Sequence, residues 1–152
     1  MRQEIGNKLV LRSAVQADLP AIERLLTAND LILEGVREAV GDFVVAEEGG
    51  AIVGTIGLEV RGAFALLRSA AVDPARHRGG IGAQLVERVV ERALDHQLRA
   101  LYLFTPTAAP FFERHGFTGT TREAIPAELR ETGQFSHACG ATAVTMVRML
   151  EQ

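Results

Sequence analysis

Residues 71–83 read AVDPARHRGGIGA, and this glycine-rich turn is the most informative stretch of the chain. An apolar strand pattern runs into Asp73-Pro74, and a helical pattern begins at Ile81. The start of a helix presents unpaired N–H groups and the positive end of the helix dipole. Glycines there let an anion approach the backbone, so the turn predicts a phosphate or pyrophosphate site. The alternative is a flexible turn with solvated arginines.

Two other phosphate-binding motifs do not fit this turn. No Lys-Ser or Lys-Thr follows the glycines, as a P-loop requires. The spacing from Gly80 is G-x-G-A-Q-L, which departs from the G-x-G-x-x-G of a Rossmann dinucleotide site.

The segments on either side of the turn alternate between strand and helix periodicity. Upstream, we expect strands at 8–15, 42–47, 51–60 and 64–72 and helices at 18–28 and 33–40. Asp18 is the expected cap of the first helix, and its expected buried face comprises Leu19, Ile22, Leu25 and Leu26. Downstream, we expect helices at 81–96 and 108–115, strands at 99–104, from 117 and at 143–150, and a helical turn or two at 126–131. This order predicts an α/β domain with a largely antiparallel first half and a crossover helix.

Composition limits the class of protein. The chain has 152 residues and a net charge of −3, so we expect one domain, residues 1–152, and no binding to nucleic acid or to an anionic membrane. No apolar stretch reaches the ~18 residues of a membrane span. The single cysteine, Cys139, allows no internal disulfide, and the four histidines lack metal-ligand spacing. We therefore expect a cytoplasmic protein without a metal.

The stretch AVDPARHRGGIGAQLV resembles the acyl-CoA-binding segment of the GNAT N-acetyltransferases, whose pattern is Gln/Arg-x-x-Gly-x-Gly/Ala. Gly80 and Gly82 match the glycines, whereas His77 stands at the Gln/Arg position. The resemblance extends to LRSAVQADLPAIERLL, VAEEGGAIVGTIGLEV and AAPFFERHGF. It implies the GNAT fold, a mixed and mostly antiparallel central sheet flanked by helices, whose central parallel strands splay apart.

The resemblance also implies acetyl-CoA as the co-substrate, with direct attack of an amine on the thioester. The cofactor-binding residues that it implies are Ala70, Val72, His77, Arg78, Gly79, Gly80, Ile81, Gly82, Ala83 and Phe112. Phe112 stands where the family often has a tyrosine proposed to protonate the departing thiolate. Because phenylalanine cannot donate a proton, that role is vacant or is filled by water.

A closer resemblance comes from LLRSAAVDP, LYLFTPTAAPFFERHGF and IPAELRETGQFSHACGATAVTM. These stretches are similar to the small acetyltransferases associated with arsenic-resistance gene clusters (ArsN-type) and to the acetyltransferase domain of N-acetylglutamate synthases. They imply a small-molecule amine substrate of the amino-acid kind. Family resemblance also implies a homodimer.

Three residues are candidates for catalysis. Glu59 is the candidate general base, acting through water, and its alternative is an exposed strand carboxylate. Ser69 either orients the amine or hydrogen-bonds its own strand. Thr105 stands where the family has an asparagine and is expected to line the gap between the splayed strands.

Three further residues are candidates for binding the substrate. Arg68 interrupts the apolar run FALLRSAAV, and a buried guanidinium is unfavourable unless it is paired. It therefore pairs with a structural carboxylate or binds a substrate carboxylate. Thr107 is expected at the same gap as Thr105, and His137 either reaches the acceptor pocket or lies on the surface.

Two rival functions stay open at this stage. The first is a protein N-terminal or lysine acetyltransferase, and the second is an acyl-CoA-binding sensor without chemistry. Cys139 could act as a nucleophile in a ping-pong route, but no His or Asp is evidently paired with it, so direct transfer is preferred.

Overall fold

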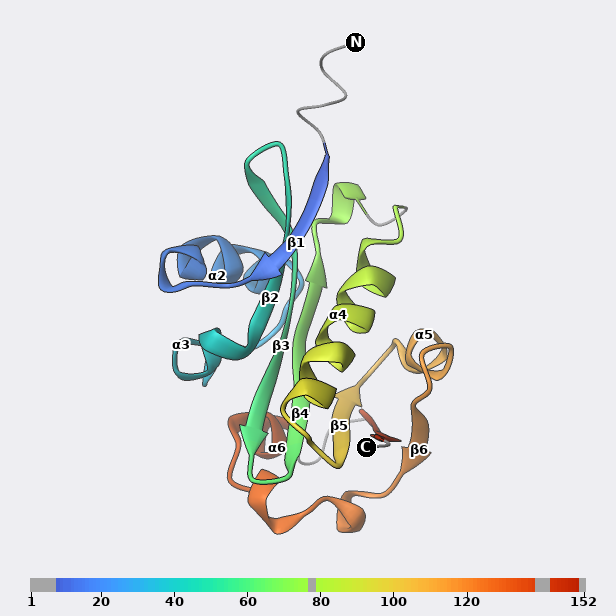
Figure 1. Cartoon of the computed structure of the whole chain (residues 1–152). Helices are drawn as coiled ribbons and strands as arrows, with labels where there is room; N and C mark the ends of the chain where they lie inside the picture. Colours follow the sequence, from blue (N-terminus) through green and yellow to red (C-terminus); the bar gives the residue numbers. More distant parts are fainter. Residues whose placement is uncertain (1–7, 77–78, 139–142, 151–152) are drawn as a thin grey trace. The chain divides into compact units, whose positions relative to one another are not determined.

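The computed structural model describes residues 8–76, 79–138 and 143–150. Its strands are β1 (Leu9–Ser13), β2 (Phe43–Glu48), β3 (Ala51–Arg61), β4 (Phe64–Val72), β5 (Ala100–Thr105), β6 (Thr118–Thr120) and β7 (Val144–Met149). Its α-helices are α2 (Leu19–Ala28), α3 (Val36–Ala39), α4 (Ile81–Asp95), α5 (Ala109–Glu113) and α6 (Gly133–Ala138), as Figure 1 shows. Short 3₁₀ turns are η1 (Gln16–Asp18), η2 (Val40–Asp42), η3 (Pro74–Arg76), η4 (Arg122–Ala124) and η5 (Ala127–Leu129).

The strands form one mixed sheet with the order β1-β2-β3-β4-β5-β7-β6. The pairs β1–β2 and β2–β3 are antiparallel, and β4–β5 is parallel. This confirms the expected α/β class and the antiparallel first half. In the described part of the chain, no helix is long and apolar enough to cross a membrane.

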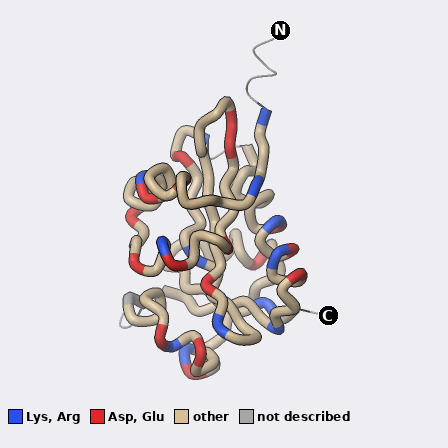
Figure 2. The backbone as a smooth tube through the Cα atoms, turned by 60° about the vertical axis from the view of Figure 1, so that its left-hand side comes forward, with Lys and Arg blue, Asp and Glu red and all other residues tan. Residues whose placement is uncertain are grey.

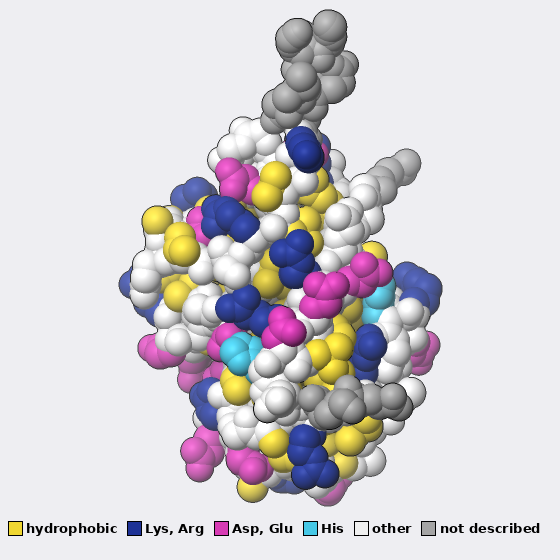
Figure 3. All heavy atoms as spheres, in the orientation of Figure 1, with side chains coloured by type: hydrophobic (Ala, Val, Ile, Leu, Met, Phe, Trp, Pro, Cys, Tyr) yellow, Lys and Arg dark blue, Asp and Glu magenta, His cyan; other side chains and the backbone are white. Residues whose placement is uncertain are grey.

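The chain forms two compact units, and β3, β4 and α4 contribute residues to both. The first comprises Met1–Gly57 with Ser69–Val89, and the second comprises Leu58–Arg68 with Val90–Gln152. Acidic and basic positions are interspersed along the backbone (Figure 2), and the face drawn in Figure 3 mixes both charges with apolar side chains. This is the pattern of a solvated surface.

The core of the first unit lies between α2 and the sheet. The expected apolar face of α2 is buried, and it packs with Phe43 and Val45 of β2 and with Val36 of α3. Phe43 pairs with Gly57 across the β2–β3 ladder, and its ring is fully buried. An added Cβ at Gly57 would overlap this ring, so the aromatic side chain fills the space above the glycine.

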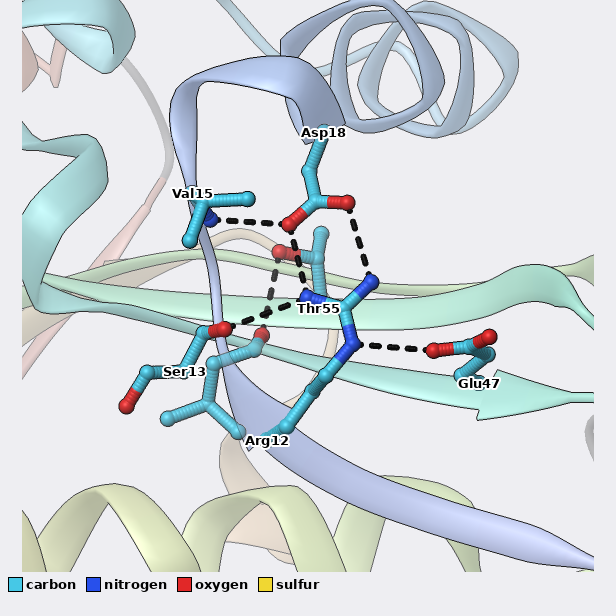
Figure 4. Close-up of polar contacts among 7 residues, drawn as sticks. Arg12, Ser13, Val15, Asp18, Glu47 and Thr55 are labelled. Carbon is cyan, nitrogen blue, oxygen red and sulfur yellow. Dashed lines mark hydrogen bonds and ion pairs between the residues drawn. The ribbon is translucent and has the colours of Figure 1, made fainter.

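A charged network closes this core at β1 (Figure 4). Arg12 donates to both oxygens of Asp18, at 2.8 and 3.0 Å, and its Nε donates to Glu47 Oε1 at 2.8 Å. Asp18 Oδ2 also accepts the backbone N–H of Val15 at 2.8 Å. The hydrogen bond from Arg12 is the largest cause of a lowered pKa at Asp18, although burial opposes it.

The prediction that Asp18 caps α2 is right about the position of this residue and wrong about its hydrogen bond. Asp18 occupies the position before the helix, but its carboxylate makes no capping hydrogen bond to α2. It turns back to Arg12 and Val15 instead, because a bond to a guanidinium is stronger than one to a neutral amide.

The second unit is built on β4, β5 and β7. The parallel β4–β5 ladder has three pairs, from Phe64↔Ala100 to Leu66↔Tyr102, so it ends before either strand does. β5 continues its antiparallel pairing with β7 to Thr105. Leu66, Ala100 and Tyr102 form a buried cluster with Ile125 and Leu129. The segment from η4 to α6 therefore covers this face of the strands.

Candidate active site

The glycine-rich turn lies in the first unit, between β4 and α4. Asp73 holds its start, because its backbone N–H donates to Val53 O at 2.8 Å and its Oδ1 accepts the N–H of Ala75 at 3.0 Å. The guanidinium of Arg76 forms an ion pair with Glu48. The charge of Arg76 is therefore shared with a carboxylate and does not act on the turn alone.

The start of α4 is fixed against the sheet at Gly54. An added Cβ there would lie 3.0 Å from Leu85 Cδ1 and 3.1 Å from Ile81 Cγ2, which is tighter than most such contacts, so the glycine favours this close packing of α4 on β3. Ile81 is buried at the first position of the helix. The first turn of α4 is thus packed against β3 through Ile81.

The glycines of the turn face open space. Gly80 has a φ of +72°, and an added Cβ there would meet nothing within 4 Å; one at Gly79 would meet only Ile81 Cγ1, at 3.8 Å. A cavity of about 630 Å³ lies beside them, lined by Leu9, Glu48, Pro74, Ala75, Arg76, Gly79, Ile81 and Gln84. An exposed backbone next to a helix start is suited to an anion such as a pyrophosphate.

The other residues expected to bind the cofactor differ in how exposed they are. Gly82 and Ala83 are half-buried in the first turn of α4. His77 and Arg78 lie outside the described residues. Val72 is half-buried at the end of β4, and Ala70 is exposed.

Ser69 interrupts the regular geometry of β4. Its φ is +60°, and it is the one non-glycine residue with a positive φ inside a described strand. A left-handed residue in a strand turns the adjacent peptide groups out of the regular ladder. Such strain occurs most often at functional sites.

A buried charged cluster lies in the second unit, immediately before Ser69. Arg68 Nη1 donates to Glu59 Oε1 at 3.0 Å, and Arg61 Nη2 donates to Glu59 Oε2 at 2.8 Å. The Arg68 side chain has no exposed surface, and that of Glu59 is 6% exposed. Two guanidinium groups thus share one carboxylate.

This cluster settles the alternative for Glu59 and shows one partner of Arg68. Glu59 is not an exposed strand carboxylate, since it is buried and paired at both oxygens. Arg68 does pair with a carboxylate of the same chain. Arg61 was missed, although its place two residues after Glu59 on one strand puts both side chains on the same face.

The threonines of the β5 end differ from each other. Thr105 is buried, and its Oγ1 accepts the N–H of Ala108 at 2.9 Å, so it fixes the loop that leads into α5. Thr107 is exposed. His137 belongs to α6, and Cys139 lies outside the described residues.

Phe112 is a core residue of α5. It is buried, with its ring in edge contacts with Phe111 at 5.1 Å and Phe117 at 5.7 Å between centroids. Gly116 follows this segment with a φ of +90°. Among the residues described, no group of three His, Cys, Asp or Glu side chains could hold a metal ion.

Comparison with known proteins adds an independent finding. A family model described as an acetyltransferase (GNAT) domain matches residues 39–119. An amino-acid acetyltransferase of Mycobacterium tuberculosis is 34% identical over 93% of this chain and 84% of its own length. An amino-acid acetyltransferase of Aeromonas salmonicida is 28% identical over 84% of this chain, which spans only 32% of that protein.

Solved structures share the fold. Rv2747 from Mycobacterium tuberculosis, crystallised with CoA and a second ligand, has a TM-score of 0.81 at 31% identity and covers 93% of this chain and 99% of its own. The N-acetylglutamate synthase of Neisseria gonorrhoeae, in complex with CoA and N-acetyl-glutamate, has a TM-score of 0.82 at 20% identity. That match covers 95% of this chain and 36% of the synthase.

Proposed function

The chain belongs to the GNAT acetyltransferase family, and from this premise we propose that it transfers the acetyl group of acetyl-CoA to the amino group of a small amino acid. Two relatives named amino-acid acetyltransferase support this acceptor class. One of them is similar along nearly the whole of both chains. Two of the similar solved structures contain bound CoA.

The observation that carries the proposal is the buried Arg68. Its guanidinium and that of Arg61 share the carboxylate of Glu59, so this buried cluster joins two cations to one anion. A guanidinium matches the geometry of a carboxylate, and we propose that the carboxylate of the acceptor binds at this cluster. A free amino acid carries such a carboxylate on the carbon that bears its amine, whereas an internal or N-terminal peptide residue does not.

The glycine-rich turn is the proposed site for the pyrophosphate of acetyl-CoA. Gly79 and Gly80 face open space, while Ile81, Gly82 and Ala83 form the first turn of the helix. Arg78 is proposed to add positive charge, and His77 is proposed as a further contact of the cofactor. Ala70 and Val72 are proposed to meet the pantetheine arm through their backbone groups, and Phe112 is proposed as a further cofactor contact.

The proposed reaction is a direct transfer. The neutral amine attacks the thioester carbon, the C–S bond breaks, the amine loses one proton, and the thiolate of CoA gains one to leave as free CoA. Ser69 directly follows Arg68 in β4 and has the positive φ that strains this strand. The peptide groups that this strain reorients are candidates for binding the oxyanion.

Glu59 acts, in this proposal, first as a positioning residue. Both of its oxygens accept hydrogen bonds from guanidinium groups, and this arrangement fixes Arg68 more directly than it prepares a base. Thr105 and Thr107 are proposed to border the acceptor, with His137 from α6. The arsenic-linked role, the homodimer and the cytoplasmic setting remain predictions from the sequence.

Release of free CoA, with mass detection of the product, tests the proposal. The panel pairs amino acids with their α-carboxamides and adds short peptides and polyamines. We expect amino acids to react and their carboxamides to react far more slowly. Turnover of peptides alone would support a protein acetyltransferase instead, and tight CoA binding without any turnover would support a sensor.

Variants at the charged cluster sharpen this test. Arg68→Met should raise the KM for an amino acid roughly tenfold or more, because a hydrogen bond to a charged group is lost. Arg61→Met is the matched control, since it removes the more exposed partner of the same carboxylate. Glu59→Gln/Arg68→Met avoids an unpaired buried charge and keeps the test valid if the single variant unfolds. An unchanged KM in the double variant would refute the role of Arg68.

A further inference from the structure

The cavity beside the glycine-rich turn contains a carboxylate as well as a guanidinium. Glu48 and Arg76 both line it, together with Gly79, and Nη1 of Arg76 forms an ion pair with Oε1 of Glu48. All three residues belong to the first unit. Because like charges repel, a carboxylate that lines the proposed site of a pyrophosphate weakens the binding of that anion.

Glu48 is held in place at the end of β2. Its backbone is paired with Leu9 of β1 on one side and with Ala51 of β3 on the other. The side chain is 15% exposed, and the atom Oε1 is buried. Within the part of the chain that the structure describes, Oε1 accepts no hydrogen bond, so the ion pair with Arg76 is what compensates for its burial.

Arg76 has a fixed backbone and a side chain that reaches solvent. It is the last residue of η3, and its backbone N–H donates to Asp73 O at 2.7 Å. Its side chain is 46% exposed, and among the described residues Glu48 is its one ion-pair partner. A guanidinium carries five N–H donors, so the group that meets Glu48 through Nη1 has further donors for a second anion.

We propose that Glu48 is an affinity-determining residue for the co-substrate, because it shares the guanidinium of Arg76 with a phosphate group of acetyl-CoA. The inference rests on the proposed function, in which this cavity receives the phosphates. When a phosphate binds, Arg76 lies between two anions, and the charge of Glu48 lowers the affinity for the phosphate. Complete transfer of Arg76 to the phosphate is unfavourable, since it would leave the buried Oε1 uncompensated.

Calorimetric titration with CoA tests this inference and needs no acceptor. Glu48→Gln removes the charge but keeps an oxygen that accepts a hydrogen bond from Arg76. We therefore expect the Kd for CoA to fall roughly three- to fivefold, the range of a partly exposed ion pair. Arg76→Gln should raise this Kd by a similar factor. In the Arg76→Gln background, Glu48→Gln should have a much smaller effect, because there is no guanidinium left to share.

A neighbouring carboxylate provides the matched control. Glu47 precedes Glu48 in β2, so its side chain lies on the other face of the sheet, where it pairs with Arg12 at 2.8 Å. Glu47→Gln should leave the Kd for CoA unchanged at about 0.15 M salt, which screens distant charges. Dephospho-CoA, which lacks the 3′-phosphate, identifies the phosphate at Arg76. A gain in affinity from Glu48→Gln with both compounds indicates the pyrophosphate, and a gain with CoA alone indicates the 3′-phosphate.

The outcomes separate this inference from the proposed function. A Glu48→Gln protein that binds CoA no more tightly than wild type would overturn the inference and leave the proposed function intact. An equal gain in affinity in the Arg76→Gln background would overturn it too, because Glu48 would then act without Arg76. A wild-type protein that does not bind CoA would overturn both. Tighter binding of CoA by Glu48→Gln, without turnover of any free amino acid, would support the inference and refute the proposed acceptor.

Discussion

Replacing Gly57 by alanine should destabilise the first unit by about 3 kcal/mol, the upper part of the range for overpacking a core. The added Cβ would overlap Cε1 and Cδ1 of the Phe43 ring and lie 2.5 Å from Cζ, whereas ordinary contacts begin near 3.4 Å. The ring must therefore move by about an ångström. It has no exposed surface and packs among Ile22, Leu26 and Val36, so the movement disturbs its neighbours.

Urea unfolding at 25 °C, followed by far-UV circular dichroism, measures this loss of stability. The midpoint of thermal unfolding should fall by roughly 6–12 °C for a domain of this size. Gly41→Ala is the matched control, because its Cβ would meet nothing within 4 Å, and it should change stability by less than about 0.5 kcal/mol.

A double variant isolates the cause. Phe43→Leu shortens the ring that the new methyl group meets, so Gly57→Ala/Phe43→Leu should be at least about 1 kcal/mol more stable than the two single changes predict. If Gly57→Ala matches the wild type within about 0.5 kcal/mol, or if the two changes are additive, the assigned packing of Phe43 over Gly57 is wrong.

Three further predictions concern charge and hydrogen bonding. Because its pKa is lowered, Asp18 stabilises the folded state above its unfolded pKa and loses this effect as the pH falls through the folded value. Asp18→Asn should therefore lower the free energy of unfolding by about 1–3 kcal/mol at pH 7. The difference from wild type should shrink below about pH 4. If urea unfolding gives the same difference across this pH range, the pairing of Asp18 with Arg12 is contradicted. Gly79→Asp should raise the KM for acetyl-CoA roughly tenfold at low salt, because it places a negative charge beside the bound pyrophosphate. Gly79→Asn, which adds no charge, should raise this KM far less. If both variants raise the KM equally, no anion binds at the turn. Thr105→Val should lower the free energy of unfolding by about 1–2 kcal/mol, measured by thermal unfolding, because the backbone N–H of Ala108 loses its acceptor. Thr105→Ser keeps a hydroxyl and should retain most of this stability. A valine variant as stable as wild type would show that the hydroxyl has no structural role.

Local patterns in the sequence predict most of the elements well. β4 occupies Phe64–Val72 as expected, and α4 begins at Ile81, because a long apolar strand and a periodic helix flank a glycine-rich turn. α6 was not expected. Its sequence, GQFSHA, has no apolar period, and its Phe135 packs on Phe104, about thirty residues earlier in the chain. A helix stabilised by a distant contact leaves no local signal.

The residues of the candidate site, like the helices and strands, could be predicted where the signal is local in the sequence. The turn at Gly79–Gly80 could be predicted because strand, glycines and helix are consecutive. The interruption of an apolar strand by Arg68 indicated a buried pair but could not name Glu59 as its partner, which required the β3–β4 arrangement.

The sharing of Glu59 by two arginines has a consequence for how related sequences diverge. Replacing Glu59 alone would leave Arg68 buried without that carboxylate, and replacing Arg68 alone would leave Glu59 with only the more exposed Arg61. Either single step passes through a less stable intermediate, whereas joint replacement by neutral residues does not. Across relatives, the residues at positions 59 and 68 should consequently change together, whereas the residue at position 61 should vary independently. Such covariation would mark the lineages that have changed the acceptor they acetylate.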